Sequence, residues 1–362
     1  MRLKAAYFKK VFEFNFNART SRGAMQHKIS WFVKLWYENE PEVFGIGECG
    51  PLPGLSLDDT VDFEQVLSSI VREINTTGEN PVEHHGHKKR AEKYLTSPSI
   101  TFGLETAWLD LKHGGRRIIF QNDFILGKPI PINGLIWMDG AAKMLEQVEK
   151  KIKSGFSCIK LKIGGLDFER ECEILRAIRS QYSPERITIR LDANGAFAVD
   201  EAWAKLRRLS EYDIHSIEQP IAENQANEMR NLCKNSPIPV ALDEELIRHQ
   251  HLEGKRELLS TLRPAFIILK PTLHGGFSGC DEWISLAEEM GIGWWITSAL
   301  ESNVGLNAIC QYTAKFSITL PQGLGTGSIY QNNIESPLAV SDGQIFQDKS
   351  RRWSFETFAP EI

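Results

Sequence analysis

Three acidic residues in the second half of the chain stand where short apolar runs end. Asp192, Glu218 and Asp243 each follow such a run directly. If the runs are parallel strands of one sheet, the carboxylates meet at one end of it and repel one another. A hard divalent cation with oxygen ligands relieves that repulsion, so the pattern favours a Mg²⁺ site, with Mn²⁺ as an alternative metal. Ion pairs with neighbouring lysines are the competing structural interpretation, and three acids at successive run ends weigh against it.

Two lysines, Lys162 and Lys270, end apolar runs on the two sides of this acidic group. A lysine with its ordinary pKa is protonated, but a second ammonium group, a divalent cation and low-dielectric surroundings lower that pKa. We therefore expect Lys162 to take a proton from one face of a substrate and Lys270 to hold charge at the other face. Lys160 shares its strand face with Lys162, because side chains two residues apart point the same way. We expect it to support Lys162 electrostatically, and a plain structural ion pair is an equal alternative.

This set of groups suits one class of reaction, the removal of a proton from the carbon next to a carboxylate. Such a proton is weakly acidic, and its loss creates an enediolate with two negatively charged oxygens. A divalent cation bound to both oxygens stabilises that charge in the transition state. The sequence therefore predicts an enzyme that works through a metal-stabilised enediolate.

Eight apolar runs alternate with amphipathic segments from about residue 130 onward. Strand–helix alternation predicts a parallel α/β sheet, and eight strands in series favour a closed barrel over an open sheet. In such a barrel the active site lies at the carboxyl ends of the strands. Helical spacing recurs between the runs, as in 167–180 and 200–210. The predicted strands are 132–136, 158–163, 187–191, 214–217, 239–242, 266–269, 294–297 and 318–320.

The first hundred residues have a different, α+β pattern. Asp58, Asp59 and Thr60 are candidate caps for the first of two expected helices. We expect three domains or segments: an α+β capping domain over 1–125, a barrel over 126–328, and a tail over 329–362 that packs back on the capping domain. The predicted elements outside the barrel are strands over 5–16, 29–37, 42–47 and 344–346, and helices over 61–74 and 101–112.

Composition limits the classes of function. The 362 residues carry a formal net charge of -5 and are 42% hydrophobic and 25% charged, as in an ordinary globular protein. No basic stripe with interleaved aromatic residues points to nucleic acid, and no apolar window approaches the length of about 18 residues that a membrane span needs. Six scattered cysteines are typical of a reduced, cytoplasmic protein. We expect a small-molecule carboxylate substrate, and the sequence does not distinguish a monomer from a homo-oligomer.

The acids and lysines expected to carry out the chemistry resemble those of the enolase superfamily, of the muconate-lactonizing-enzyme type. The resemblance spans nearly the whole chain and implies a (β/α)7β TIM-like barrel with an N-terminal α+β capping domain completed by the C-terminal tail. It also implies that the three acids bind Mg²⁺ and that the two lysines work on opposite substrate faces. The motifs that carry it are Lys160-Leu-Lys162, Asp192-Ala-Asn-Gly195, Glu218-Gln-Pro220, Asp243-Glu244 and Ile268-Leu-Lys-Pro271.

Peripheral motifs are similar to those of the o-succinylbenzoate synthase family of menaquinone biosynthesis, namely Thr20-Ser-Arg-Gly23, Gly47-Glu-Cys-Gly-Pro-Leu-Pro-Gly54, Phe102-Gly-Leu-Glu105, Ile132-Asn-Gly-Leu135, Thr297-Ser-Ala-Leu-Glu-Ser-Asn-Val-Gly305 and Gly323-Leu-Gly-Thr-Gly327. This similarity implies a lyase that dehydrates 2-succinyl-6-hydroxy-2,4-cyclohexadiene-1-carboxylate to o-succinylbenzoate. Lys162 would take the ring proton and then protonate the departing hydroxyl. The residues implied to contact substrate are Lys160, Asn194, Ser298, Ser21, Arg22, Gly23, Leu55 and Gly325.

Two other functions fit the same scaffold. An N-acylamino acid racemase or dipeptide epimerase also needs two opposed lysines, but such epimerases carry an Asp-x-Asp element at the eighth strand end. Here that region reads Gly325-Thr-Gly-Ser328, which favours an anionic substrate without an ammonium group. A catalytically inactive barrel used for binding would predict a broken lysine or acid set, and all five positions are intact.

Overall fold

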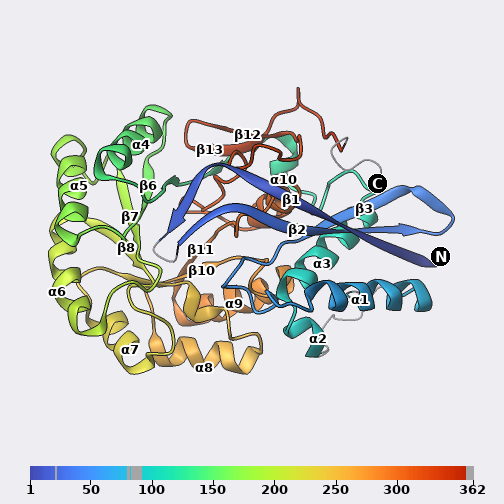
Figure 1. Cartoon of the computed structure of the whole chain (residues 1–362), viewed down its shortest axis with the longest axis horizontal. Coiled ribbons are helices and arrows are strands. Elements are labelled where there is room, and N and C mark those ends of the chain that lie inside the picture. The colour runs from blue at the N-terminus through green and yellow to red at the C-terminus, as the bar shows by residue number, and fades with distance from the viewer. Residues whose placement is uncertain (21–22, 80–81, 83–91, 356–362) are drawn as a thin grey trace.

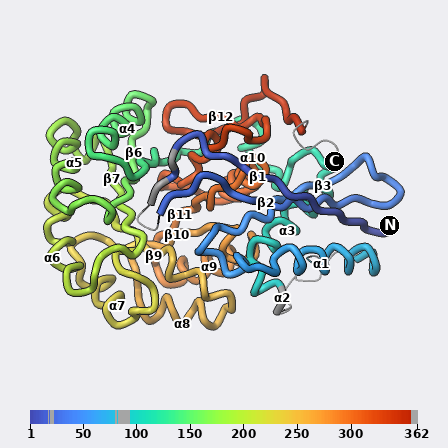
Figure 2. The backbone as a smooth tube through the Cα atoms, in the orientation of Figure 1, coloured from blue at the N-terminus to red at the C-terminus, as the bar shows by residue number. Residues whose placement is uncertain are grey.

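The computed structural model describes residues 1–20, 23–79, 82 and 92–355 (Figure 1). Its N-terminal part is a three-stranded antiparallel sheet with helices, and the larger part is a curled parallel sheet of seven strands with helices on its outer side. The chain colours in Figure 2 run from green through yellow to orange around the curled sheet, so its strand–helix units follow one another in space as they do in sequence. The two parts together form an α/β fold with an N-terminal antiparallel sheet domain.

The N-terminal sheet has the strand order β1-β2-β3. The helix α1 covers it with an apolar stripe that includes Leu67 and Ile70. The helix α3 packs so closely on β3 that a Cβ atom on Gly47 would lie 1.8 Å from the carbonyl oxygen of Gly103, which explains the glycine at that position. The elements are β1 (Leu3–Thr20), β2 (Gly23–Tyr37), β3 (Glu40–Cys49), α1 (Phe63–Thr77), α2 (Glu92–Leu95) and α3 (Pro98–Lys112).

The predicted cap of the first helix is wrong. Helix α1 begins after Asp62, whose side chain makes no capping hydrogen bond. Asp58 instead accepts hydrogen bonds from the backbone N–H of Ser99 at 2.8 Å and from the Ser99 hydroxyl at 2.7 Å. Asp59 accepts one from a backbone N–H of the preceding turn, at 2.7 Å. The acids of 58–60 therefore tie a loop to α3 and to itself, a tertiary use that local sequence does not reveal.

The parallel sheet has the order β11-β10-β9-β8-β7-β6-β5, and the first seven runs predicted from sequence form these strands. The strands are β5 (Gly134–Ile136), β6 (Cys158–Lys162), β7 (Thr188–Asp192), β8 (Ile214–Glu218), β9 (Val240–Leu242), β10 (Phe266–Leu269) and β11 (Gly293–Ile296). One interior cluster of apolar side chains from the strands and helices forms the main core. Parallel strands buried on both faces read as nearly continuous apolar runs, which is why the sequence located them well.

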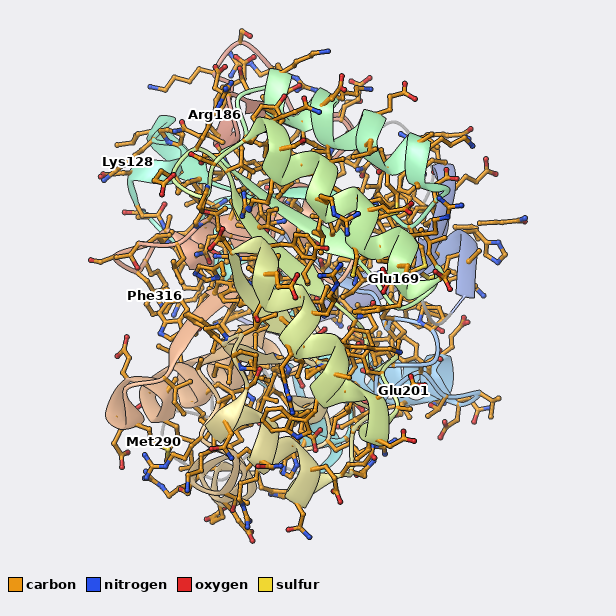
Figure 3. The ribbon with its side chains drawn as sticks, turned by 90° about the vertical axis from the view of Figure 1, so that its left-hand side faces the viewer. Lys128, Glu169, Arg186, Glu201, Met290 and Phe316 are labelled. Atoms are coloured by element: carbon orange, nitrogen blue, oxygen red, sulfur yellow. The ribbon has the colours of Figure 1, made fainter. Side chains whose placement is uncertain are left out.

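Helices separate the strands and cover the outer face of the sheet (Figure 1). Their solvent side carries charged residues such as Glu169 and Glu201 (Figure 3). The helices are α4 (Ala141–Lys153), α5 (Phe168–Gln181), α6 (Val199–Leu209), α7 (Ala226–Asn235), α8 (Leu252–Leu262), α9 (Gly276–Met290) and α10 (Asn303–Thr313). Short 3₁₀ turns are η2 (Asp123–Leu126), η3 (Ser210–Tyr212) and η4 (Glu244–Leu246).

The predicted eighth strand, 318–320, does not form, and its side chains are half-buried or exposed. The next residues of the chain instead connect the two edge strands. The Gln322 N–H donates to the Pro131 carbonyl at 2.8 Å, on the β5 side. The Gly323 N–H donates to the Ile296 carbonyl at 2.8 Å, on the β11 side. Gln322 and Gly323 alone make these hydrogen bonds, so the connection between the edge strands has no apolar run that would mark it in the sequence.

The tail contacts both parts of the molecule. The Gln331 N–H donates to the Glu13 carbonyl at 2.8 Å, so the chain near its end lies along β1. Further on, β12 (Leu338–Ser341) pairs with β13 (Gln344–Gln347), and β13 pairs with β4 (Ile130–Pro131), next to the first strand of the parallel sheet. Across the described ranges of the chain, no helix has the length and apolar character that crossing a membrane requires.

Candidate active site

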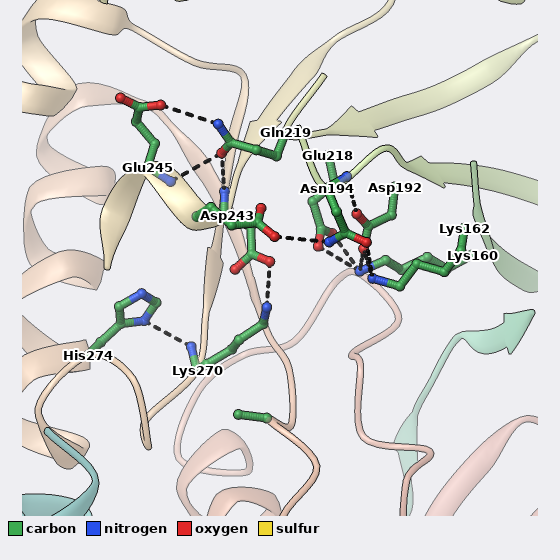
Figure 4. Close-up of polar contacts among 12 residues, drawn as sticks. Lys160, Lys162, Asp192, Asn194, Glu218, Gln219, Asp243, Glu245, Lys270 and His274 are labelled. Carbon is green, nitrogen blue, oxygen red and sulfur yellow. Dashed lines mark hydrogen bonds and ion pairs between the residues drawn. The ribbon is translucent and has the colours of Figure 1, made fainter. Parts of the chain in front are cut away.

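The three predicted acids lie at neighbouring strand ends. Asp192 ends β7 and is paired in register with Lys162 of β6 and Glu218 of β8. Asp243 follows β9 directly. All three carboxylates are almost completely buried. Figure 4 shows them between Lys160 and Lys162 on one side and Lys270 on the other, as the run ends predicted.

On one flank, two lysines of β6 hold the carboxylates. The Lys160 ammonium lies 2.7 Å from both Glu218 carboxylate oxygens and 2.7 Å from Asp192 Oδ2. The Lys162 ammonium donates to Asp192 Oδ2 at 2.5 Å and to Asn194 Oδ1 at 2.9 Å. Asn194 adopts a left-handed backbone conformation (φ 46°) just past the strand, which turns its amide into this group.

On the other flank, Lys270 follows β10 and donates to Asp243 Oδ2 at 2.5 Å. Its backbone N–H donates to Nδ1 of His274 at 3.0 Å, so the imidazole braces the main chain of the lysine (Figure 4). The Gln219 side chain accepts from the backbone N–H groups of Asp243 and Glu245, both at 3.2 Å. These contacts fix the backbone on which the acid and the lysine stand.

The two flanking lysines differ in their electrostatic surroundings. Burial lowers the pKa of Lys162. The attraction of Asp192 opposes this shift, but the Lys160 ammonium cancels part of that attraction. Burial also acts against the charge of Lys270, but attraction by Asp243 and two further carboxylates outweighs it and raises the Lys270 pKa. These directions suit Lys162 as the base and Lys270 as a group that stays charged.

The acids also differ from one another. Burial, together with the negative charges of Asp192 and Asp243, raises the pKa of Glu218 well above its ordinary value. Burial acts on Asp192 too, but the ammonium groups of Lys160 and Lys162 hold its pKa well below the usual range. Mutual repulsion of buried acids is the electrostatic condition that a cation among them would relieve.

The donor set fits a hard divalent cation. Asp243 Oδ1 is buried and has no hydrogen-bond partner among the residues that the structure describes. Asp192 Oδ1 accepts from the Asn194 N–H at 3.1 Å, and the other oxygens of the three acids face ammonium groups. No three acidic, histidine or cysteine side chains of the described chain are grouped as a ready metal site. A cation would therefore compete with lysine contacts, and its binding would release Lys162 and Lys270 toward a substrate.

A cavity lies above these groups. Four of the residues expected to contact substrate line it: Lys160, Asn194, Ser298 and Gly325. Lys162 and Lys270 both reach it. The structure thus brings the two lysines and four of the expected binding residues to one space. Their roles toward a substrate remain predictions.

The other four expected binding residues come from the N-terminal part. Ser21 and Arg22 lie outside the described residues. Gly23 begins β2 and is exposed, and Leu55 is half-buried against an apolar cluster at the junction of the two parts. Neither of these two lines the cavity; the N-terminal residues that do are Met25 and Leu52.

Sequence reasoning missed several lining residues. Asn133, Thr326 and Met25 were not singled out, although the first two lie inside motifs that were. Asn133 lies beside Gln322, which joins the edge strands, and its N–H donates to the Gln322 carbonyl at 2.9 Å. The motif that contains Asn133 was the available signal, but which of its residues faces inward depends on register.

Comparisons with known proteins show which family the chain resembles. Residues 143–349 match the family model described as "Enolase C-terminal domain-like". The chain is 46% identical over 353 residues to the o-succinylbenzoate synthase of Desulfotalea psychrophila, covering 91% of this chain and 94% of that protein. The crystal structure of MenC from the same organism superposes with a TM-score of 0.83 at 41% identity, covering 96% of this chain and all of that one. An N-succinylamino acid racemase of Thermus thermophilus is 31% identical over 55% of this chain and 52% of its own length.

The fold, the strand-end lysines and acids, and the family match define the class of protein, the enolase superfamily. Within that superfamily, the nearly full-length relative narrows the assignment: the chain belongs to the o-succinylbenzoate synthase family.

Proposed function

We propose that this protein dehydrates 2-succinyl-6-hydroxy-2,4-cyclohexadiene-1-carboxylate to o-succinylbenzoate. The observation that carries the proposal is the presence of Lys162 and Lys270 in one cavity, on opposite flanks of three buried carboxylates. A substrate placed between them would meet a nitrogen base on one face and a positive charge on the other. The o-succinylbenzoate synthase relative gives this general chemistry its particular substrate.

Asp192, Glu218 and Asp243 would hold Mg²⁺, with Mn²⁺ as the alternative. When bound, the cation supplies positive charge next to the substrate carboxylate, where negative charge develops in the transition state. Lys160, already in contact with Glu218 and Asp192, would attract the ionised forms of these acids and hold them in place.

The protein groups would carry the proton steps. Lys162, whose pKa burial lowers, takes the proton from the ring carbon that bears the carboxylate. Electrons of that C–H bond move into the carboxylate to give the enediolate, and they then form the new ring double bond as the C–O bond to the hydroxyl breaks. The same Lys162 ammonium gives its proton to the departing oxygen, which leaves as water. Lys270 stays charged and stabilises the negative charge from the other face.

The remaining assignments follow from position in the cavity. Asn194 would contact the substrate beside the metal site, and Ser298 and Gly325 would line the side that holds the succinyl chain. We also propose the domain scheme of a (β/α)7β TIM-like barrel over 126–328, a capping domain over 1–125, and a tail over 329–362 that completes it. The substrate is a small carboxylate, and we place the protein in the cytoplasm.

An ultraviolet assay of the purified protein with the cyclohexadiene carboxylate and Mg²⁺ tests the proposal. We expect aromatic product to form, to stop on addition of EDTA, and to resume with excess Mg²⁺. Absence of product in all three conditions would refute the synthase activity.

The same two lysines support a second reaction, racemisation of an N-succinylamino acid, because each can serve one face of the α-carbon. The racemase of Thermus thermophilus is a partial relative that favours this candidate. Solvent deuterium exchange into N-succinylamino acids by the Mg²⁺-loaded protein would reveal it. A protein that exchanges deuterium but forms no aromatic product would be a racemase.

A further inference from the structure

A buried carboxylate, Glu301, stands directly behind the wall of the cavity. Its side chain is fully buried and follows β11 in the loop that leads to α10. One oxygen, Oε2, accepts from the Ser298 hydroxyl at 2.5 Å and from the Ala299 N–H at 2.8 Å. The other, Oε1, accepts from the Thr272 hydroxyl. Glu301 thus touches the residues of the cavity wall without lining the cavity itself.

The hydroxyl groups in front of Glu301 form a chain with one direction. Burial raises the pKa of Glu301, and Lys28 and the two hydroxyl donors oppose that shift. In its ionised form the carboxylate can only accept, so the Ser298 proton then points to Glu301. Ser298 Oγ in turn accepts from the Thr326 hydroxyl at 2.8 Å and from the Leu300 N–H at 3.1 Å. Both Ser298 and Thr326 line the cavity. Thr326 is the outer end of the chain, and its proton can turn to a ligand at the loss of one hydrogen bond, whereas Ser298 is held at three points.

The N-terminal sheet holds this loop from behind through a second carboxylate. Glu48, at the end of β3, accepts from the Ser302 N–H at 3.0 Å, from the Ser302 hydroxyl at 2.5 Å and from the Gly305 N–H at 3.1 Å. These donors are the first turn of α10 and the residue next to Glu301. A Cβ atom on Gly305 would lie 2.7 Å from Glu301 Cβ and 2.9 Å from Glu48 Oε2, so the two acids converge there.

A buried lysine of the N-terminal sheet supplies the positive charge of this cluster. Lys28 is 1% exposed, and its ammonium donates to the Ser30 hydroxyl at 3.5 Å. Ser30 donates to Glu48 at 2.8 Å. Lys28 also acts electrostatically on Glu301. Loop and sheet are therefore joined by charge as well as by hydrogen bonds.

We propose that Glu301 is a positioning residue of the substrate cavity: by holding Ser298 it fixes the place of the Thr326 hydroxyl, the outer hydroxyl of the chain, which meets the ligand. The inference rests on the proposed function of that cavity. Glu48 holds the loop that carries Glu301 from the N-terminal side, and Lys28 attracts the Glu301 carboxylate, so the fit of the substrate chain depends on residues that never touch it.

Two substitutions of Glu301 separate position from charge. Glu301→Met removes the acceptor and keeps the bulk, and we expect KM to rise about tenfold or more with kcat changed less than threefold. Glu301→Gln loses the charge but keeps an oxygen for Ser298 and Ala299, and its amide can donate to Thr272. We expect it to restore KM to within about threefold of the parent protein. Equal KM values for Glu301→Met and the parent protein would overturn the proposal.

A double-substitution cycle tests the route through Ser298. If Glu301 acts through Ser298, the Ser298→Ala, Glu301→Met protein has the KM of Ser298→Ala alone. If the fold-changes in KM of the two single substitutions multiply in the double substitution, Glu301 and Ser298 act independently and the proposal is overturned. Thr326→Val, which removes no buried charge, should raise KM by itself, and an unchanged KM would remove Thr326 from the ligand contact.

Glu105→Met is the matched control. Glu105 of α3 accepts from the Phe277 N–H and the Ser278 hydroxyl at the start of α9, both at 2.5 Å, so it joins the same two parts without touching the cavity. We expect a lower thermal midpoint and an unchanged KM. A KM rise equal to that of Glu301→Met would assign the effect to domain docking and overturn the proposal. Failure of the proposed function is distinct, because the parent protein itself would then form no product.

Discussion

The molecule contains two buried charge clusters that are built differently. At the strand ends, Asp192, Glu218 and Asp243 face lysine ammonium groups at 2.5 to 2.7 Å. At the junction of the two parts, Glu48 and Glu301 face hydroxyl groups and backbone N–H groups instead. The first cluster adjoins a cavity, and the second is closed off from it.

The difference shows how burial of charge can serve two purposes. Lysine–carboxylate contacts can be exchanged for a cation and a substrate, because both partners are side chains and no backbone hydrogen bond has to break. Backbone N–H donors cannot move away without unwinding the first turn of α10, so the second cluster is a fixed point. Chemistry is therefore expected of the first cluster, and stability and alignment of the second.

The largest test of this contrast removes one lysine of the first cluster at a time. Lys162→Ala and Lys270→Ala are each expected to lower kcat by about a thousandfold or more, since each removes a group that we propose acts on the reacting atoms. Far-ultraviolet circular dichroism should show an intact fold. Lys255→Ala is the matched control, a buried lysine between α8 and α9 that bonds to the Gly279 carbonyl and to Glu282. The Lys255→Ala protein should lose stability and keep its kcat. Retained activity in Lys162→Ala or in Lys270→Ala would remove the substituted lysine from the mechanism.

The second test weakens the fixed point. Glu48→Met leaves the Ser302 and Gly305 N–H groups at the start of α10 without their acceptor and removes the carboxylate that attracts the Lys28 ammonium most strongly. We expect the free energy of unfolding in urea to fall by roughly 3 to 5 kcal/mol. Mg²⁺ affinity, measured by calorimetry, should stay within about threefold of the parent value, because no strand-end acid is touched. A protein of unchanged stability but altered Mg²⁺ affinity would invert the roles assigned to the two clusters.

The smallest effect concerns Asp58, a buried acid outside both clusters. Burial raises its pKa from 3.8 to about 6, although hydrogen bonds from Ser99 lower it. The folded state then binds the proton more tightly than the unfolded state. The contribution of Asp58 to the free energy of unfolding is therefore fully present below pH 4 and is lost as the pH rises to about 6. The loss at neutral pH is up to about 3 kcal/mol. Urea unfolding at several pH values should show this decline in the parent protein and a flatter profile in Asp58→Asn, and parallel profiles would contradict it.

Sequence located the first cluster and missed the second for a physical reason. Lys162, Asp192 and Glu218 each end a buried strand, and parallel strands bring such ends together whatever the loops do. Lys28, Glu48 and Glu301 meet only because two separate parts dock, and no spacing along the chain encodes that. The strand-end cluster was therefore predictable from local pattern, and the junction cluster was not.

The same reasoning explains the two errors in the fold. Gln322 and Gly323 join the edge strands with one polar residue and one glycine, so the apolar run before them was mistaken for the strand. The acids of 58–60 look like helix caps, but Asp58 bonds instead to Ser99, about 40 residues further along. In both places a tertiary contact replaced the local preference.

The pairing of the chain's end with its first strand has a consequence for biosynthesis. Glu13 and Asn15 of β1 bond to Gln331 and Ile329, contacts that join residues more than 300 positions apart. A ribosome releases β1 long before it makes these partners. The N-terminal sheet therefore lacks its contacts with Ile329 and Gln331 until every strand–helix unit has been synthesised. The cavity is lined by Met25 and Leu52 from that side and by Gly325 and Thr326, which follow the last strand–helix unit, so a nascent chain gains its binding site only after all of these units have been made.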